Sequence, residues 1–390
     1  MKLPGDLSPG SFLTQHWQKK PLFMPDAIQS ESTVPRPLLA PEELAWLATL
    51  DDVESRLIFT EQHEGSIRYR VEHGPFEDTV LSALPQSGWT LLVQDVEKHL
   101  PDFRQWLSLV QFIPEWRIDD LMISFAAAGG GVGPHKDNYD VFLCQATGHR
   151  EWRLARPDDN ILPATCGDLA LLQAFTDPTP TIAASGDVLY LPPAVPHWGI
   201  ATDSCMTLSI GMRAPTLAEL HCAFERAVPD AANPFIQSAN ENALFYADPT
   251  LRDNESQHGR ISRQAVERCR TLTTSSVAVT DKALATALGC VVTDLKAWLA
   301  PELPNRLDGA DYPTTSQLAV HGMARIAWWA EQDELLVFAN GGCMQAAPVQ
   351  ADFAQSLCER RELTAKRAKQ EENTELIDWL WDMGAFDFSG

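Results

Sequence analysis

Three polar residues in this chain have types and a spacing that could bind a metal ion. His135 and Asp137 stand two positions apart in the segment GPHKDNYDVF, and His197 follows the segment GDVLYLPPAVP. Because side chains alternate along an extended strand, His135 and Asp137 can point to the same side. A histidine beside a carboxylate supplies two ligands of a facial triad, which suits non-haem Fe(II) with open coordination positions. The third ligand must then be a distant histidine, and His197 is the candidate.

A second histidine–carboxylate pair, His149 and Glu151, competes with the first. It follows a turn-like segment, and strand alternation places His149 on the face opposite Arg150. Arg150 would share its face with Trp152 and Leu154, and this apolar pair indicates that the face points inward. A buried arginine needs an anion, for which a bidentate guanidinium–carboxylate pair is well suited. A small dicarboxylic co-substrate would supply the anion, and a carboxylate of the protein itself is the alternative.

The elements that must position these residues are short and rich in β-formers. Residues 116–213 contain many apolar runs separated by Gly and Pro, which is typical of a sandwich or barrel of jelly-roll type. The pattern predicts a turn at 186–187, a strand over 188–191 and a bend at the prolines that follow. In a jelly roll, a late strand lies beside an early one, so His197 can reach the other two residues. The glycine run at 129–134 lacks the GK[ST] ending of a phosphate loop, and we expect a pliable loop at the barrel mouth.

The regions before and after residues 116–213 show a helical sequence pattern instead. Helices are predicted at 10–20 and 40–51, and the chain becomes helical after Pro215. The last region combines helices with an apparent hairpin, which indicates a small winged-helix-like module. We therefore predict an α+β protein with three parts, namely a jelly-roll domain, a helical region and a winged-helix-like domain, over residues 1–214, 215–299 and 300–390.

Composition limits the classes of partner. The chain has 390 residues and a net charge of −23, which would repel a nucleic-acid backbone, so DNA binding is not expected. The charge suits a basic partner, or it serves solubility alone. No apolar run is long enough to span a membrane, and the first residues lack the pattern of a signal peptide, so we expect a cytoplasmic location. The eight cysteines form no CxxC pair and are expected to be reduced thiols.

Taken together, several segments resemble the Jumonji-C, cupin-like 2-oxoglutarate oxygenases. The resemblance narrows to the bacterial ribosomal oxygenases, which hydroxylate an arginine of a large-subunit ribosomal protein. It covers residues 11–249 in order, whereas the C-terminal third matches only in general layout. The segments that carry it are FLTQHWQKKPL, EWRIDDLMISF, GGGVGPHKDNYDVF, GDVLYLPP with PHWG, SIGMRAP and FYADP.

This resemblance implies a cofactor, a co-substrate and a reaction. His135, Asp137 and His197 would be the iron ligands and the catalytic centre. Arg150 would hold the distal carboxylate of 2-oxoglutarate, with Ser124 beside it. Oxidative decarboxylation of 2-oxoglutarate by O₂ would give succinate and CO₂, and a hydroxyl group would be placed on the substrate.

Further expectations concern the substrate and one departure from the family pattern. A substrate arginine would need carboxylates near the barrel mouth, for which Asp119 and Asp120 are candidates. The acidic chain would suit a basic ribosomal protein. Ala194 stands where the family usually has glycine after two prolines, which is expected to shift that turn and to spare the ligand.

The resemblance also implies a homodimer formed by the middle helices. That region also contains an apolar stripe at helical spacing, formed by Leu217, Leu220, Phe224 and Val228. Such a stripe must pack against another surface, which could be the barrel of the same chain or the same helices of a second chain. Two other functions remain open. One is an oxygenase of the same fold that acts on another protein or on tRNA, and the other is a non-catalytic cupin-like regulator whose C-terminal module binds DNA.

Overall fold

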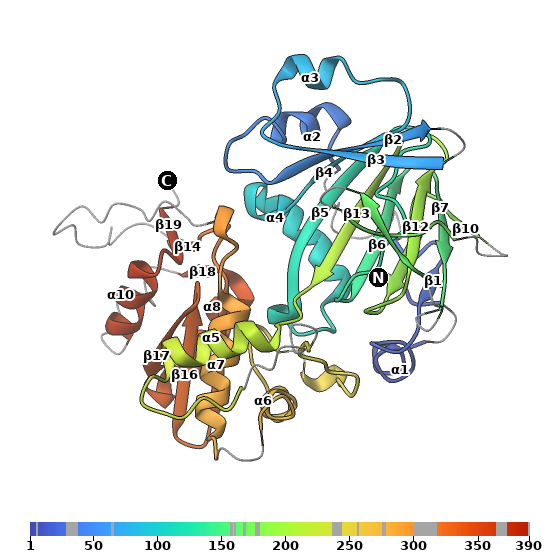
Figure 1. Cartoon of the computed structure of the whole chain (residues 1–390). Coiled ribbons are helices and arrows are strands. Elements are labelled where there is room, and N and C mark those ends of the chain that lie inside the picture. Colours follow the sequence, from blue (N-terminus) through green and yellow to red (C-terminus); the bar gives the residue numbers. More distant parts are fainter. Residues whose placement is uncertain are drawn as a thin grey trace. The chain divides into compact units, whose positions relative to one another are not determined.

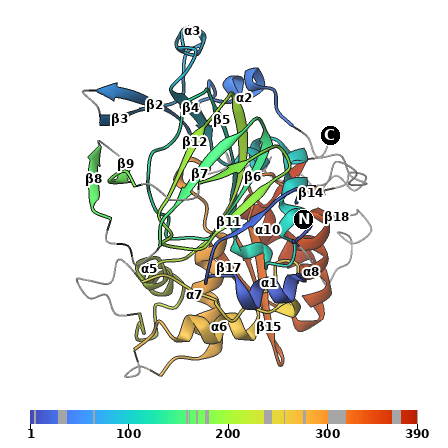
Figure 2. The same cartoon turned by 90° about the vertical axis from the view of Figure 1, so that its right-hand side faces the viewer.

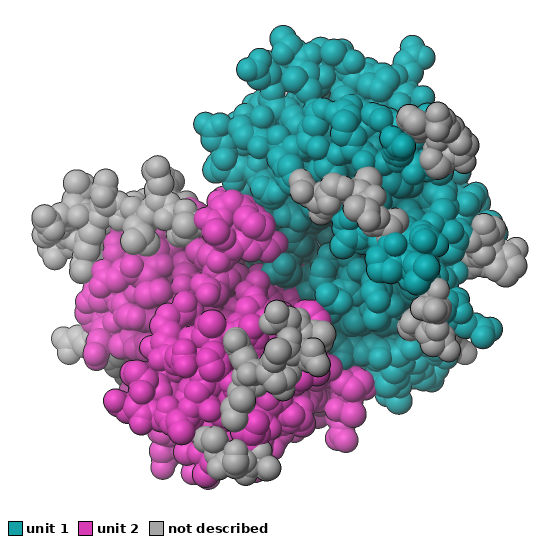
Figure 3. All heavy atoms as spheres, viewed as in Figure 1, with its two compact units in different colours: residues 1–110, 119–212 teal, residues 111–118, 213–390 magenta. Residues whose placement is uncertain are grey.

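The computed structural model divides the chain into two compact units, which Figure 3 colours separately. Unit 1 comprises residues 1–110 and 119–212, and unit 2 comprises residues 111–118 and 213–390. The structure describes residues 1–4, 7–28, 38–63, 66–156, 159, 161–166, 169–175, 180–235, 244–255, 257–274, 278–299, 318–363 and 373–388. The proline-rich segment at 300–305 lies outside these residues. The predicted three-part division stays a prediction.

Unit 1 is built on an eight-stranded sheet in the order β1-β11-β6-β13-β5-β4-β2-β3. Strands that are distant in sequence are neighbours here, since β11 pairs with both β1 and β6, and β6 pairs with β13. The bounds are β1 (Leu22–Met24), β2 (Ser55–His63), β3 (Ser66–His73), β4 (Trp89–Val93), β5 (Ile118–Ala126), β6 (Val141–Thr147), β11 (Val188–Leu191) and β13 (Cys205–Met212).

A smaller sheet completes the jelly roll. It has the order β10-β7-β12, and Figure 2 shows β7 and β12 side by side. Its bounds are β7 (Arg150–Leu154), β10 (Thr181–Ala183) and β12 (His197–Ala201), and a separate hairpin joins β8 (Pro163–Cys166) to β9 (Leu169–Leu172). Apolar residues of both sheets meet in one core cluster, because alternate positions of each strand face it; the cluster holds Val141, Leu143, Trp152, Ala183, Leu189, Leu191 and Val195. The predicted jelly roll is confirmed.

Short helices flank the strands of unit 1 (Figure 1). Their bounds are α1 (Pro9–Gln15), α2 (Pro41–Leu47), α3 (Asp78–Ser82) and α4 (Val96–His99), followed by a 3-10 segment over Pro101–Val110. Ser8 caps α1 by accepting a hydrogen bond from the Ser11 amide, and Phe12 packs edge-on against Tyr190. The helix predicted over 10–20 is thus shorter: it ends at Gln15, and turns follow, with a left-handed φ of 53° at Gln18.

Unit 2 contains helices and two further three-stranded sheets, in the orders β18-β14-β19 and β15-β16-β17. The predicted hairpin is present as β15 and β16, in register from Ile326 opposite Ala339. The bounds are α5 (Leu217–Ala227), α6 (Arg263–Arg270), α7 (Asp281–Thr293), β14 (Leu318–Val320), β15 (Ile326–Glu331), β16 (Glu334–Ala339), β17 (Gly342–Ala346), α8 (Ala351–Arg360), β18 (Glu362–Leu363), α10 (Thr374–Asp382) and β19 (Phe386–Phe388). Within the described ranges, no helix is both long and apolar enough to cross a membrane.

The apolar stripe of α5 is covered within its own chain. Leu217, Leu220 and Phe224 are at most 2% exposed. They share one core cluster with residues of α6, α7, β15 and β16, including Leu288 and Phe338. The expectation that the barrel or a second chain covers this stripe is therefore wrong, because α7 of the same chain packs against α5. The homodimer itself stays a prediction.

Candidate metal centre and co-substrate pocket

A backbone bridge brings two distant histidines together. The His135 amide donates to the His197 carbonyl at 3.0 Å, and the His197 amide donates to the His135 carbonyl at 2.8 Å. On its other edge, β12 pairs with β7, so that His197 stands opposite Leu154. The two imidazole centroids lie 4.2 Å apart. The strand order of the jelly roll thus places a side chain from the start of β12 next to one from the loop before β6.

The imidazole nitrogens that remain available face one carboxylate. Nε2 of His135 lies 3.9 Å from Asp137 Oδ1, and Nε2 of His197 lies 3.6 Å from Asp137 Oδ2. Nδ1 of His135 is bonded to the Gly133 carbonyl at 2.9 Å, and Nδ1 of His197 to the Val195 carbonyl at 3.0 Å. A hydrogen bond from Nδ1 to a carbonyl fixes the tautomer and leaves Nε2 with its lone pair. One ligand atom from each of the three residues lies within 4.8 Å of the others.

Electrostatics keeps the buried histidine in its metal-binding form. Burial, together with the neighbouring His135, lowers the pKa of His197 to about 4 against the opposing effect of Asp137. His197 is therefore neutral near pH 7, as a ligand must be. Two imidazole nitrogens and one carboxylate form the donor set that suits Fe(II) with open coordination positions. By its geometry and donor chemistry, the cluster of His135, Asp137 and His197 fits such an ion.

The turn before His197 contains a non-glycine residue in a left-handed conformation. Ala194 has a φ of 64°, and its amide donates to the Asp137 carbonyl at 2.7 Å. The turn is thereby attached to the backbone of Asp137. Left-handed φ values bring the Cβ of an L-residue close to the following carbonyl, whereas glycine has no such penalty.

Replacing Ala194 by glycine should stabilise the protein. Relief of the left-handed conformation is worth about 1–2 kcal/mol, and the greater freedom of glycine in the unfolded chain offsets about 0.5–1 kcal/mol of it. We expect the free energy of unfolding in denaturant to rise by about 0.5–1 kcal/mol. The same change at Ala201, the buried last residue of β12, should lower the free energy of unfolding. A loss at both positions would contradict this account.

A cavity of about 300 Å³ adjoins the three residues. Its walls are formed mainly by every second residue of neighbouring strands, because alternate side chains of a strand point to the same face. The polar and charged residues among its lining are Arg56, Gln94, Asp120, Ser124, His135, Lys136, Asp137, Tyr139, Arg150, His197, Thr207 and Ser209. The lining therefore combines the possible metal ligands with both residues implied for 2-oxoglutarate.

Arg150 is the buried cation of this cavity. It is 4% exposed, and its Nε is buried with no hydrogen-bond partner among the described residues. One terminal nitrogen lies 3.8 Å from the Cys205 sulfur, and the guanidinium lies 5.8 Å from the Trp152 ring centroid. Within the described part of the chain, no carboxylate forms an ion pair with Arg150, so the alternative of a protein partner fails there. A buried fork with an unused donor fits a carboxylate of a bound molecule.

Ser124 lies in the same cavity wall on β5. It is 3% exposed, and its hydroxyl donates to the Thr207 carbonyl at 3.3 Å. Asp120, two alternations earlier on the same strand, also lines the cavity, whereas Asp119 is not among the lining residues. Of the two carboxylates proposed for the barrel mouth, only Asp120 is placed to meet a molecule there.

The competing pair lies at the surface. His149 is half exposed, and its amide and Nδ1 both contact the Asp203 carboxylate at 2.7 Å. It is not among the residues of the cavity, whereas Arg150 and Trp152 are. Strand alternation correctly separated the two faces of β7.

The glycine run before His135 includes two closely packed positions, and the expected pliability of this loop stays a prediction. A Cβ at Gly130 would lie 2.1 Å from the Trp89 carbonyl oxygen, and one at Gly131 would lie 2.4 Å from that of Gly199. Backbone hydrogen bonds also join Gly129 and Gly130 to Ala201. Glycine is required at these two positions because two backbones approach closely in the segment that leads to His135.

Some residues of the cavity were not identified in the sequence. Thr207 and Ser209 line it from β13, and Met122 lines it from β5. The sequence did carry a signal for these residues. Each of them occupies an alternate position on its strand, and the residues next to it on that strand are buried. Which face of each strand points into the cavity, however, depends on the pairing of β13 with β6 and β5. This pairing is a property of the fold and cannot be read from the sequence.

A known protein family matches the part of the chain that contains the cluster. The profile of the JmjC domain matches residues 105–220, a range that spans β5 to β13 and all three residues of the cluster. Over residues 105–220 the chain is therefore similar to a JmjC domain, and this range includes β5 to β13 of the jelly roll.

Individual relatives narrow the comparison. The chain is 38% identical over 240 residues to the ribosomal protein uL16 3-hydroxylase of Escherichia coli K12, an alignment that covers 62% of this chain and 60% of that protein. It resembles the X-ray structure of E. coli YcfD with a TM-score of 0.72 and 27% identity, over the whole of both chains. A structure of YcfD described as a ribosomal oxygenase in complex with cobalt and 2-oxoglutarate has a TM-score of 0.68 at 27% identity, over 97% of each chain.

Proposed function

We propose that this protein is an Fe(II)- and 2-oxoglutarate-dependent hydroxylase that acts on an arginine side chain of a large-subunit ribosomal protein. The observation that carries the proposal is the Arg150 fork, which is buried without a carboxylate partner in the described residues and lines the same cavity as the His135, Asp137 and His197 cluster. When bound, iron(II) and 2-oxoglutarate would activate O₂, so that one of its oxygen atoms hydroxylates the substrate and the other enters succinate, with release of CO₂.

The chain's own residues would hold the parts of this reaction in place. His135 and His197 would bind the metal through Nε2, because Nδ1 of each ring already bonds to a carbonyl. Asp137 would provide the third ligand and partly neutralise the ion. Arg150 would hold the distal carboxylate of 2-oxoglutarate through two parallel hydrogen bonds, with Ser124 beside it. The apolar side chains of the cavity wall would keep water from the reacting atoms.

The nature of the substrate rests on charge and on the relatives. Asp120 is 8% exposed and lines the cavity, so it can pair with a cationic side chain that enters from outside. The net charge of −23 suits a basic protein. The E. coli relative is named for the ribosomal protein uL16. A ribosomal substrate would be met in the cytoplasm, the location expected from the sequence.

The decisive test is mass spectrometry of ribosomal proteins from a strain that lacks this protein. One protein should lose about 16 Da, the mass of one oxygen atom, and fragment spectra should place the loss on an arginine. The wild-type protein should restore it, and the His197→Ala variant should not. A loss found only on another protein or on tRNA would support an oxygenase with a different target. The absence of any 2-oxoglutarate turnover would support a non-catalytic regulator.

Substitution of Arg150 by lysine should weaken 2-oxoglutarate binding. Lysine keeps the charge but loses the planar fork, so at most one of two parallel hydrogen bonds survives. We expect the KM for 2-oxoglutarate to rise by about tenfold, since one charge-assisted hydrogen bond contributes about 1.5–3 kcal/mol. Arg153→Lys, on the same strand but paired with Glu151, serves as the control. An unchanged KM in the Arg150 variant would assign the anchor to another cation.

We also propose that the protein is a homodimer. The resemblance of the middle helices supports this, whereas the covered stripe of α5 does not bear on it. Light scattering at micromolar concentration should return twice the chain mass, as a two-fold contact between identical chains requires. A monomer at that concentration would refute the assembly and leave the proposed activity untouched.

A further inference from the structure

Three buried charged residues adjoin the start of β5, next to the proposed substrate contact Asp120. They are Asp95, Glu97 and Lys98, which are 1%, 2% and 6% exposed. Lys98 forms an ion pair with Asp95, and its Nζ lies 3.7 Å from Glu97 Oε1. Taking such groups out of water costs several kcal/mol per ion unless they are paired and hydrogen-bonded, so their remaining contacts are informative.

The remaining contacts of this cluster are to the backbone on both sides of Asp120. Lys98 Nζ donates to the Asp119 carbonyl at 3.2 Å, which belongs to the peptide group before Asp120. Glu97 Oε2 accepts a hydrogen bond from the Leu121 amide at 2.9 Å, which belongs to the peptide group after it. Two consecutive residues of α4 therefore hold the two peptide groups that flank Asp120.

The position of these bonds explains why side chains are used. β4 pairs with β5 from Thr90 opposite Ala126 as far as Val93 opposite Ile123, and β4 ends there. The chain then turns through Asp95, with a left-handed φ of 56°, into α4, which lies beside the start of β5 (Figure 1). Side chains of α4 thus continue the hydrogen bonding of β5 beyond the end of its neighbour strand.

The direction of the Asp120 side chain depends on this part of the backbone. Asp120 and Ser124 point into the cavity, while Leu121 and Ile123 on the opposite face are fully buried. A Cβ at Gly211 of β13 would lie 3.0 Å from Asp120 Oδ1, so the glycine leaves room for the carboxylate at this position. A rotation of either flanking peptide would redirect the carboxylate, since strand side chains follow the backbone pleat.

We propose that Glu97 and Lys98 are positioning residues that clamp the backbone on both sides of Asp120 and thereby aim its carboxylate at the cationic side chain of the substrate. This inference rests on the proposed function, because Asp120 is assigned there to substrate binding. The clamp is distinct from the metal ligands and from Arg150, so it should govern affinity for the protein substrate and not for 2-oxoglutarate.

Glu97→Met is the informative variant, because it removes the acceptor of the Leu121 amide and leaves Lys98 paired with Asp95. With recombinant uL16 of the same organism as the probe, we expect its KM to rise by about fivefold or more, within the range of coupling between residues of one hydrogen-bond network. The KM for 2-oxoglutarate should stay as in the wild type. Glu97→Gln keeps an acceptor oxygen for the amide and should restore the KM for uL16.

A double substitution separates positioning from general stability. If Glu97 acts through Asp120, Glu97→Met should add little to the KM for uL16 in an Asp120→Asn background. Val188→Ala is the control for stability, because Val188 lies in the core on β11. It should lower the unfolding midpoint without raising the KM for uL16 selectively over the KM for 2-oxoglutarate. Equal fold-changes in both backgrounds, or parallel changes in both KM values, would overturn the clamp alone. Wild-type protein that turns over 2-oxoglutarate but leaves uL16 unmodified would overturn the proposed substrate, and the clamp with it.

Discussion

Replacement of His197 by alanine should abolish both metal binding and turnover. His197 is the most buried of the three residues in the cluster, and its Nε2 faces Asp137 at 3.6 Å. A site with three protein ligands has no substitute when one is lost. We expect metal affinity and succinate production to fall by more than about 100-fold, since the loss of a partner that only orients a ligand already costs about 10–100-fold. Calorimetric titration with Co(II) and an assay of succinate would measure the two effects.

His149→Ala is the matched control for this prediction. His149 contacts a carboxylate as the cluster histidines do, but it is half exposed and bonded to Asp203. Its removal should leave metal affinity and turnover within about twofold of the wild type, as for most surface substitutions. Normal iron-dependent turnover in His197→Ala would show that the ligand set is wrong, even if the fold is right.

The arrangement of the site could be predicted where it depends on local spacing. The two-residue spacing of His135 and Asp137 pointed to their pairing, although only an isolated bridge and no strand forms there. Strand alternation separated His149 from Arg150, because a strand offers only two faces. Short apolar runs between turns also indicated the jelly roll, and with it the meeting of His197 and His135. These features follow from the chain's own periodicity, which the structure preserves.

Features that depend on contacts between distant segments could not be predicted in this way. The stripe of α5 was visible in the sequence, but its cover by α7 of the same chain was not, because any apolar surface could have served. The close packing of two positions in the glycine run was not visible either, since a sequence does not reveal that Trp89 and Gly199 approach Gly130 and Gly131. The clamp around Asp120 was hidden for the same reason.

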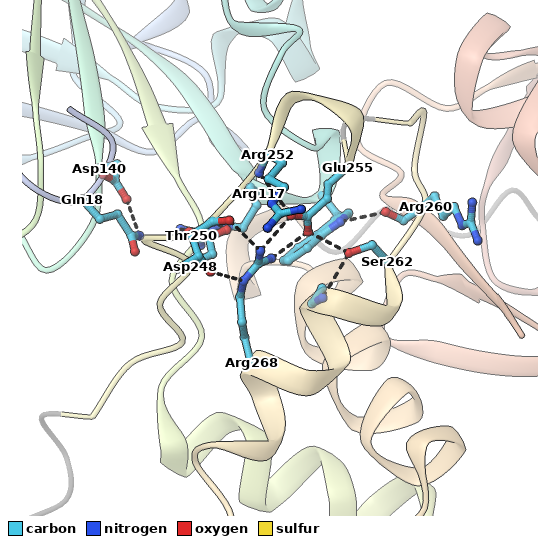
Figure 4. A network of polar contacts seen from close by, with 12 residues as sticks. Gln18, Arg117, Asp140, Asp248, Thr250, Arg252, Glu255, Arg260, Ser262 and Arg268 are labelled. Atoms are coloured by element: carbon cyan, nitrogen blue, oxygen red, sulfur yellow. Dashed lines mark hydrogen bonds and ion pairs between the residues drawn. The ribbon is translucent and has the colours of Figure 1, made fainter. Parts of the chain in front are cut away.

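A buried ion pair is the feature of unit 2 with the largest expected effect on stability. Arg117 and Asp248 are both fully buried, and the guanidinium donates to the two carboxylate oxygens at 3.0 and 3.2 Å (Figure 4). The pair joins the segment 111–118 to the segment that precedes α6, in the same unit. Nearby, Arg268 holds Glu255 in a second pair of bonds. Loss of one partner would leave a charge in a place that water does not reach.

Asp248→Ala should therefore lower the free energy of unfolding by about 3–5 kcal/mol, because an uncompensated buried charge is strongly destabilising. Denaturant titration followed by tryptophan fluorescence would measure it, since Trp116 lies beside Tyr246 in the same core. Asp294→Ala is the control: Asp294 pairs with Arg226 at 3.3 Å with both side chains about half exposed, and such pairs contribute about 1 kcal/mol or less. In the double variant Arg117→Met, Asp248→Leu, most of the loss should be recovered, because apolar side chains of similar volume can replace a buried pair. If the double variant is as unstable as Asp248→Ala, packing around this position and not the unpaired charge is the cause.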